Sequence, residues 1–507
     1  MFKILAILLP VIILVMIEGL LRLSGYGYDT RLFVSSEANK NLLVMNRDIS
    51  KKYFTIEKNA TMGNRDEFYR QKNSETLRFF VLGASSSIGY PYGHNGAFPR
   101  MLKYRLQFEY PNTTIEIINL SLTAVNSYTL ADFAWHVANQ QPDGILVYAG
   151  HNEYYGALGV ASTNRLSGNP TIIRAMIVAK NLKLMQWLAN VAASFRKSEQ
   201  NLSDPNLTLM QRMAAGKEVN YQSDMFFDGI KQFDHNMQFI LRIFQEKQIP
   251  VFIGTLVSNL GGQKPLGDDK NAHAEFLAGE QARLRGDIEN ALQHFLLAKE
   301  YDNLRFRAPE AINEKIRGYA STFPNVRIVD VQCVFEASSP DGIIGRELIL
   351  EHVHPNLEGY WLMADAFYLR LKELYPESKT ELCPVIGLND YPLTSFDSIY
   401  GDISVRILKS LWPFNEKMST SLPNTVEARL AAAFIEKKIN WTEAMKRLYE
   451  GYLRENNYTA AVRVLEGMCL ELPYNFAFIN QTAQLFHKMG ENEKAYFYSN
   501  KYETSKR

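Results

Sequence analysis

Cysteine is scarce in this chain, and its three cysteines, Cys333, Cys383 and Cys469, lie far apart. No Cys-x-x-Cys pair or zinc-ligand spacing occurs, so neither a zinc site nor a disulfide framework is indicated. One disulfide between two of the three stays open, and Cys333, after a predicted strand, is expected to be a small buried apolar side chain. An excess of charge of one sign is also lacking, since the net charge is +1, which offers no electrostatic basis for nucleic-acid binding.

The composition that is present is that of a folded protein with a large core. Hydrophobic residues make up 46% and charged residues 21% of 507 residues, which indicates two or three domains. At the N-terminus, Lys3 precedes the apolar run 4–17, and no small-x-small cleavage site follows. We interpret residues 1–23 as an uncleaved signal-anchor (transmembrane) helix with the body extracytoplasmic, periplasmic or at the cell surface. A cleaved signal peptide is the alternative.

Apolar runs alternate with helical patterns between residues 75 and 383. This alternation predicts a parallel sheet with helices on both faces, joined by right-handed crossovers. Residues 24–74 show little periodicity and are expected to be a connector packed on that domain. The predicted strands are Leu77–Leu82, Ile115–Asn119, Gly144–Ala149, Pro250–Thr255 and Val326–Val331, and the helices between them include Phe98–Glu109, Thr129–Asn139 and Asp228–Lys247.

The most informative segment, Gly83-Ala84-Ser85-Ser86-Ser87-Ile88-Gly89, follows the first predicted strand directly. The carboxyl end of a strand is the edge at which open α/β sheets bind ligands, and small residues there let a substrate approach the backbone. An ordinary turn into a helix would use the same residue types.

Two further segments favour catalysis. The third strand is followed by Gly150-His151-Asn152-Glu153, in which the Asn152 amide can donate to a developing oxyanion. Glu351-His352-Val353-His354-Pro355 precedes a helical pattern, and a carboxylate three residues before a histidine can orient it as a base for a serine. His352 is the alternative base, but on an extended segment it would face away from His354.

Serine, asparagine and Glu-x-x-His, in this order, resemble the SGNH (GDSL-type) hydrolase family. The resemblance implies a three-layer α/β/α, flavodoxin-like domain with a five-stranded parallel sheet and a serine acyl-enzyme. The implied roles are a nucleophile at Ser85, a base at His354, an orienting acid at Glu351, oxyanion donors at Ser121 and Asn152, and substrate contacts at Gly83, Gly150 and His151.

The chain departs from the family pattern at several of these positions. Ala84 replaces the aspartate of Gly-Asp-Ser, and Glu153 and Glu351 replace shorter aspartates. Ser121 replaces a glycine but keeps the backbone N–H that the family uses. We expect no cofactor and no metal, because no helix-borne histidine pair or cysteine pair supports a site at His151, His352 and His354. His352, His151 and His94 are expected to be local hydrogen-bonding groups.

Segments such as Pro91–Phe98 and Leu304–Pro309 resemble a bacterial SGNH subgroup that carries tetratricopeptide-like (TPR-like) helices. Helical insertions are predicted at about 160–225 and, TPR-like, at 270–305, the second packing on the C-terminal helices. Within the first, Thr171–Phe195 is amphipathic and is expected to pack on the domain, with a membrane-surface or lid helix as the alternative. Turn formers predict a linker over 384–423, and a 34-residue spacing predicts TPR-like repeats over 424–507.

These features predict a membrane-anchored extracytoplasmic serine esterase or O-acyltransferase acting on acyl esters of a cell-surface glycan or lipid. The membrane would be bound through the N-terminal helix, and a protein partner through the TPR-like helices. The alternative is a catalytically inactive SGNH-fold binding protein whose repeats hold an envelope partner. The departures at Ala84 and Ser121 favour this alternative, whereas the retained serine, asparagine, histidine and acid favour the enzyme.

Overall fold

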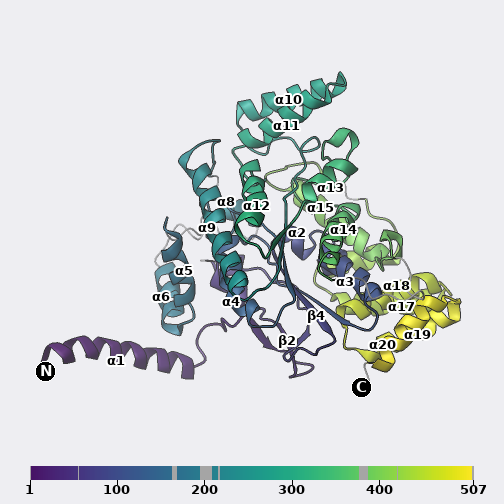
Figure 1. Ribbon diagram of the computed structural model, residues 1–507, viewed down its shortest axis with the longest axis horizontal. Helices are drawn as coiled ribbons and strands as arrows, with labels where there is room; N and C mark the ends of the chain where they lie inside the picture. Colours follow the sequence, from purple (N-terminus) through teal and green to yellow (C-terminus); the bar gives the residue numbers. More distant parts are fainter. Residues whose placement is uncertain are drawn as a thin grey trace.

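The computed structural model describes residues 2–54, 56–162, 168–194, 208–214, 217–375, 386–418 and 421–504. A five-stranded parallel sheet with the strand order β5-β4-β6-β7-β8 forms its centre (Figure 1). The central strands β6 and β7 are buried throughout, as expected for a parallel sheet covered on both faces. Each strand lies within two residues of its predicted bounds, so the predicted sheet is confirmed. The strands are β4 Thr76–Gly83, β5 Thr114–Asn119, β6 Gly144–Tyr148, β7 Val251–Gly254 and β8 Val326–Val329.

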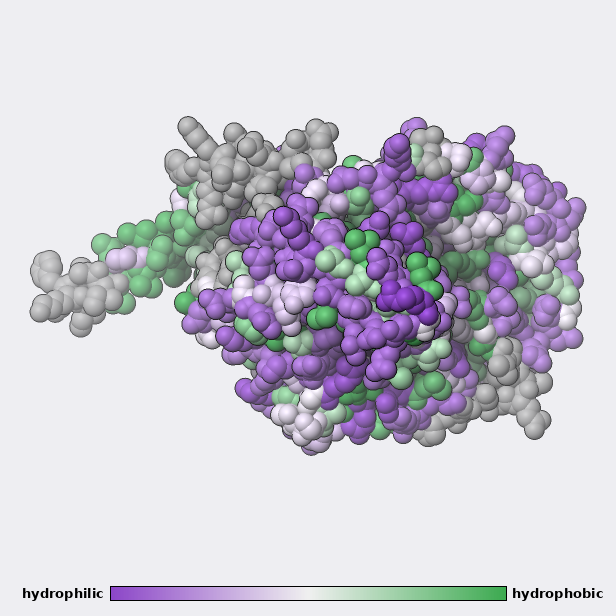
Figure 2. Space-filling model, turned by 90° about the horizontal axis from the view of Figure 1, so that it is seen from above, coloured by the Kyte–Doolittle hydropathy of each residue, from purple (hydrophilic) through white to green (hydrophobic). Residues whose placement is uncertain are grey.

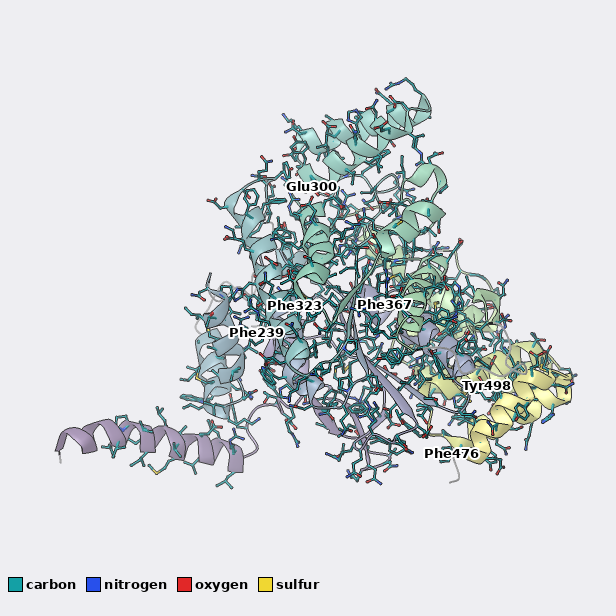
Figure 3. All side chains as sticks on the ribbon, viewed as in Figure 1. Phe239, Glu300, Phe323, Phe367, Phe476 and Tyr498 are labelled. Carbon is teal, nitrogen blue, oxygen red and sulfur yellow. The ribbon has the colours of Figure 1, made fainter. Side chains whose placement is uncertain are left out.

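Helices cover both faces of this sheet and complete the three layers. Helices α3 and α14 pack together on one face, with α13 against α14, and helices α4, α9 and α12 cover the other (Figure 1). Figure 3 shows Phe367 of α14 close to the sheet, where it stacks on Phe98 of α3 with ring centroids 5.0 Å apart. The bounds are α2 Ser85–Ile88, α3 Phe98–Glu109, α4 Ser127–Ala138, α9 Asp224–Glu246, α12 Glu310–Thr322, α13 Val331–Ser338 and α14 Leu357–Lys372.

The connector before the domain contains a second sheet that the sequence pattern did not predict. Its strands are antiparallel and are β1 Phe33–Ser35, β2 Leu42–Met45 and β3 Phe68–Tyr69. They have four residues or fewer, too short to show a period of two. The small sheet joins the main core through Phe68, whose ring packs edge-on against Phe80 of β4 at 5.4 Å.

The helical insertions lie on different sides of the domain (Figure 1). The first contributes α5 Pro170–Ala179, α6 Lys183–Ser194 and α8 Leu209–Ala214, and the second contributes α10 Lys270–Leu284 and α11 Ile288–Tyr301. In the α10–α11 pair, Gly279 faces the ring of Phe295, which allows the helices a close approach. The expectation that this pair packs on the C-terminal helices is wrong, because its apolar cluster is closed by Leu260 and Ile343 of nearby loops.

The C-terminal region is helical from residue 395 onward, and the predicted linker itself contains a helix, α15. The side chain of Thr394 caps α15 and Asp397 caps the Thr394 N–H in return, a capping box that favours helix formation despite the flanking turn formers. Equivalent helices of the last two hairpins begin about 34 residues apart, as TPR-like repeats do. The helices are α15 Ser395–Ser410, α16 Val426–Ile435, α17 Trp441–Arg454, α18 Tyr458–Glu471, α19 Phe476–Met489 and α20 Asn492–Thr504.

These repeats pack directly on the α/β domain. Phe497 of α20 contacts Phe108 of α3 with ring centroids 4.2 Å apart, and the Tyr104 hydroxyl of α3 donates to buried Glu466 of α18 at 2.9 Å. Tyr498, labelled in Figure 3, donates to the same carboxylate at 3.1 Å. Because the main core continues into α18–α20, the repeats are part of the folded body.

The N-terminal helix, α1 Phe2–Leu23, extends away from the body and carries exposed apolar side chains between Leu8 and Leu23 (Figure 2). Its last turns dock on α6, where the Glu18 carboxylate accepts the N–H groups of Lys183 and Leu184 at 3.0 and 2.7 Å. In the described part of the chain, no helix combines the length and the apolar character needed to cross a bilayer.

The cysteines differ from expectation at one position. Cys333 is exposed on α13, because the buried face of this helix carries Val331 and Phe335, four residues apart, and Cys333 lies between them on the opposite side. Cys469 is buried and free, and Cys383 lies outside the described residues.

Candidate active site

The candidate nucleophile lies at the junction of β4 and α2. Ser85 is the first residue of α2 and is half-buried, so its hydroxyl stands at the carboxyl edge of the sheet. Gly89 ends this short helix with φ of 101°, a left-handed conformation that suits glycine. The first residue of a helix has no intrahelical partner for its N–H, so the Ser85 N–H is left available for another acceptor.

Ser85, His354 and Glu351 form a serine–histidine–glutamate triad. In the chain, His354 lies 269 residues and Glu351 lies 266 residues after Ser85. The Nε2 atom of His354 lies 2.7 Å from the Ser85 Oγ, and its Nδ1 atom contacts the Oε1 atom of Glu351. With Glu351 accepting the Nδ1 proton, Nε2 is free to accept the serine proton. The structure thus brings Ser85, His354 and Glu351 together in the arrangement expected from the sequence.

A tight loop before α14 holds the two histidines and the glutamate. A β-bridge between Ile349 and Pro355 closes the loop, and the Leu350 N–H donates to the His354 carbonyl at 2.9 Å. Asn356 then caps α14 by accepting the Gly359 N–H at 2.9 Å. The loop geometry therefore fixes the direction of His354 before any substrate arrives.

Glu351 is held as a carboxylate inside this loop. Its side chain is buried and accepts hydrogen bonds from the backbone N–H groups of His352, Val353 and His354. Burial alone would raise its pKa, but the two neighbouring histidine side chains outweigh burial and hold the pKa well below the ordinary value. A charged Glu351 can orient His354 and stabilise the imidazolium formed during catalysis.

The alternative base, His352, points away from the nucleophile. Its Nδ1 atom lies against the second carboxylate oxygen of Glu351, and its ring packs among aromatic side chains: Phe306 at 6.0 Å and Phe414 at 5.6 Å between centroids. The rings of His352 and His354 are nearly perpendicular. His354 alone of the two contacts Ser85.

The expected oxyanion donors leave strands adjacent to β4. Gly83 of β4 is paired with Tyr148 of β6, so Asn152 emerges beside Ser85 at the same sheet edge. No described residue forms a hydrogen bond with the Asn152 side-chain amide, which is free to donate. Ser121 follows β5 on the other side, but its N–H already donates to the Asn119 Oδ1 atom at 3.1 Å.

The two glycines expected to contact substrate are tightly packed against the protein. A Cβ at Gly83 would lie 2.2 Å from the Ser87 Oγ, and one at Gly150, whose φ is 152°, would lie 2.5 Å from a methyl group of Leu256. In both places the protein itself occupies the space that a side chain would need. The sequence signal, a glycine beside a catalytic motif, does not separate close packing from close approach of a ligand.

His151 and Glu153 flank Asn152 and are both buried. The Nδ1 atom of His151 accepts the Ala308 N–H at 3.2 Å. The Glu153 carboxylate accepts the Ser127 N–H and hydroxyl at 2.9 and 2.8 Å and the Gln232 amide at 2.9 Å. Burial is the main cause that raises the pKa of Glu153 to about 7, although these hydrogen bonds oppose it.

An aromatic wall lies beside the triad, and the sequence reasoning missed it. Tyr90 packs on the His354 ring with centroids 4.6 Å apart, and Phe306 lies 4.8 Å from Tyr155 and 6.0 Å from Trp412. Trp412 and Phe414 come from the segment taken as a linker. The available signal was the Leu-Arg-Phe-Arg-Ala-Pro segment 304–309, whose role could not be derived from residue types alone.

Three of these groups are spaced as metal ligands would be. Glu351, His352 and His354 each offer one ligand atom, and these atoms lie within 4.8 Å of one another. In the triad, however, the ring nitrogens of His354 already contact Ser85 and Glu351, so a cation there would displace the serine–histidine bond. His151, considered with the histidines in the sequence, is not part of this cluster.

His94 is a local hydrogen-bonding group, as expected, and it links the repeats to the sheet edge. Its Nδ1 atom lies 2.8 Å from Glu471 of α18, and its Nε2 atom lies 3.2 Å from Asp66. Asp66 also accepts the N–H of Asn119, the residue that holds Ser121. The second oxyanion segment is therefore supported by the connector and by the C-terminal helices.

Comparisons with known proteins agree with this description at the level of fold. No protein-family model matches the chain, and no curated protein matches it in sequence. Solved structures do match, each at low similarity. A GDSL-like lipase from Bacteroides thetaiotaomicron has 12% identity over 61% of this chain and 93% of its own, with a TM-score of 0.31. A lipase/acylhydrolase from Enterococcus faecalis has 14% identity over 59% and 97%, with a TM-score of 0.30.

An acetyl-xylooligosaccharide esterase from Geobacillus has 14% identity over 62% of this chain and 99% of its own, with a TM-score of 0.29. At this similarity the neighbours carry no argument about chemistry, which depends on the triad itself. The chain combines a flavodoxin-like α/β/α domain with a Ser-His-Glu triad, and the solved structures it resembles include proteins of the GDSL type, the family that its sequence motifs resemble.

Proposed function

We propose that this protein is a serine ester hydrolase or a related O-acyltransferase that works through an acyl-enzyme on Ser85. The observation that carries the proposal is the 2.7 Å contact between the Ser85 Oγ and the His354 Nε2, with Glu351 behind the histidine. A histidine within hydrogen-bond reach of a serine, oriented by a buried carboxylate, is the arrangement that activates a hydroxyl as a nucleophile.

The reaction would proceed in two halves. Ser85 attacks the ester carbonyl while His354 takes its proton, and the carbonyl oxygen becomes an oxyanion held by the Ser85 N–H and the Asn152 amide. His354 then gives the proton to the departing alcohol, which leaves the acyl group on Ser85. In the second half His354 activates water or a sugar hydroxyl, which takes the acyl group and restores the serine.

The surroundings of the triad support an ester substrate with both apolar and polar parts. Tyr90 packs on the His354 ring, and Phe306 packs on His352 and Trp412; aromatic rings of this kind bind apolar chains and the faces of sugars. We further propose a cell-surface glycan or lipid ester as the substrate. The exposed apolar side chains of α1 support membrane association through this helix, with the body on the extracytoplasmic side.

The complete triad disfavours the alternative of an inactive binding protein. A protein that had lost catalysis would have no need for a buried charged Glu351 behind His354, because burying a carboxylate is costly. The C-terminal helices remain candidates for a protein-binding surface on their exposed side.

The test is hydrolysis of p-nitrophenyl acetate and p-nitrophenyl butyrate by the full-length protein, beside Ser85→Ala and His354→Ala. We expect both variants to lose the activity, with about 1000-fold or greater loss of kcat. Labelling with a serine-reactive fluorophosphonate provides a second readout, since it detects an activated Ser85 even in a strict transferase. Wild-type protein that neither turns over these esters nor takes up the label would refute the proposal.

A further inference from the structure

The site has one oxyanion donor fewer than its family resemblance implies. The Ser121 N–H, expected to point at the oxyanion, donates to the Asn119 Oδ1 atom at 3.1 Å. Asn119 is itself fixed, because its side-chain amide donates to the Ser87 carbonyl at 2.7 Å and its N–H donates to Asp66 at 2.9 Å. Releasing the Ser121 N–H would therefore require breaking a well-anchored hydrogen bond.

His151 offers an N–H donor, at Nε2, that no acceptor among the described residues engages. Its ring is more than nine-tenths buried, and its Nε2 atom has no hydrogen-bond partner among the described residues. Buried polar atoms without a partner are rare in native proteins, and a catalytic role is one reason for keeping such an atom.

The tautomer of His151 follows from the backbone around it. The Nδ1 atom accepts the Ala308 N–H at 3.2 Å, so Nδ1 carries no proton and the proton of the neutral ring resides on Nε2. Burial, followed by the neighbouring His352 and His354, lowers the pKa of His151 to about 3. The ring therefore stays neutral and presents an N–H donor over the physiological pH range.

The position of His151 in the fold brings its ring near the triad. His151 follows the end of β6, immediately before Asn152, and β6 is paired with the strand that ends at Ser85. The side chains that act on it electrostatically include His354 and Glu351, both members of the triad. The buried, neutral N–H of His151 therefore lies near the triad and beside Asn152 in the chain.

We propose that the Nε2–H of His151 is the third donor of the oxyanion hole, in the place expected for the Ser121 N–H. This proposal rests on the proposed serine-ester chemistry. When Ser85 adds to the carbonyl carbon, the electron pair of the C=O bond moves to oxygen, and that oxygen accepts N–H groups from Ser85, Asn152 and His151. No proton leaves His151, which stabilises charge without acting as an acid.

Two substitutions separate the donor from its anchor. His151→Asn keeps an oxygen at the position of Nδ1, which can still accept the Ala308 N–H, but has no group at the position of Nε2. His151→Gln does the reverse, because its amide nitrogen reaches the position of Nε2 and the acceptor for Ala308 is lost. The pair therefore distinguishes transition-state stabilisation from local folding.

The experiment measures kcat and KM for p-nitrophenyl acetate with the full-length protein and both variants, together with thermal unfolding. We expect His151→Asn to lower kcat about 100- to 1000-fold with little change in KM, and His151→Gln to remain within about tenfold of the wild type. Phosphonylation of Ser85 by a fluorophosphonate, whose P=O oxygen uses the same donors, is expected to slow in parallel in His151→Asn.

Two outcomes would overturn this role. One is a folded His151→Asn variant with a kcat within about threefold of the wild type. The other is a His151→Gln variant that loses as much activity as His151→Asn while both unfold at lower temperature, which would mark a structural role. Ester hydrolysis by the wild type no faster than by Ser85→Ala would refute the proposed chemistry, and this inference with it.

Discussion

Replacing Glu351 by glutamine changes one oxygen of a buried carboxylate to an amide and tests the triad most directly. In the structure one carboxylate oxygen contacts the His354 Nδ1 and the other accepts the His352 N–H. In one orientation, a glutamine turns its NH₂ group towards His354 and its oxygen towards the His352 N–H, which leaves the NH₂ group facing the His354 backbone N–H that the Glu351 Oε1 atom accepts. His354 must then accept at Nδ1, which moves its proton to Nε2, where it blocks proton transfer from Ser85.

The opposite orientation of the glutamine amide restores the correct tautomer of His354, but it also leaves a buried donor without an acceptor. It places an NH₂ group against the His352 N–H, two donors facing each other in a site where Glu351 is 1% exposed. A buried unsatisfied donor costs about 1–3 kcal/mol, and in either orientation the glutamine faces such a donor and lacks the negative charge that stabilises the His354 imidazolium. A wrong tautomer in such a triad lowers kcat by about 10⁴, and we expect Glu351→Gln to lower kcat/KM by about 10³–10⁴.

The assay is hydrolysis of p-nitrophenyl acetate by full-length Glu351→Gln, with circular dichroism to show that the variant is folded. The matched control is His352→Ala, which removes the second histidine on the same carboxylate. We expect this control to stay within about tenfold of the wild type, because His352 does not contact Ser85. The reasoning is refuted by a folded Glu351→Gln variant within about tenfold of the wild type, or by a His352→Ala loss equal to that of His354→Ala.

Two further predictions concern buried charge. Because burial raises the pKa of Glu153 from 4.5 to about 7, its contribution to stability is complete below pH 4.5 and is lost as pH rises through 7, by about 3 kcal/mol. The free energy of unfolding, measured by urea denaturation at pH 5 and at pH 8, is expected to show this loss in the wild type and a smaller loss in Glu153→Gln. An equal loss of stability between the two pH values in both proteins would contradict the prediction. Glu116 pairs with the fully buried guanidinium group of Arg78. Glu116→Ala leaves this buried charge without its carboxylate partner, and chemical denaturation is expected to show a loss of stability of about 3–5 kcal/mol. A loss below about 1 kcal/mol would contradict this, and Arg78→Met with Glu116→Leu is the matched control, expected to recover most of the stability.

Local pattern was sufficient for the main sheet and for the nucleophile. The runs before Ser85 and Asn152 are apolar, of strand length and bounded by glycine, so both side chains could be assigned to the carboxyl edge of a parallel sheet. The Glu-x-x-His spacing before a helix likewise limits where His354 can point. These signals are local in the chain, and the structure agrees with them.

Other features escaped the sequence because they depend on contacts between distant segments. The strands of the small N-terminal sheet are too short for periodicity, and the helix at Ser395–Ser410 was hidden among turn formers. Trp412 and Phe414 lie near the triad loop only because the segment after that helix folds back onto His352 and Phe306. Contacts between segments so far apart in the chain cannot be inferred from the spacing of residues in the sequence.

The sequence by itself determined the chemistry that is available: a serine, a histidine, an acid and an amide, each at the end of a strand or the start of a helix. The tertiary structure decided which backbone and side-chain donors are free. The Ser121 N–H is engaged by Asn119, whereas the His151 Nε2 has no partner among the described residues. The Ala308 N–H, from a segment 157 residues away, sets the tautomer of the His151 ring. Hydrogen-bond occupancy is a property of the packed state, since each donor is satisfied by whichever acceptor the fold places beside it.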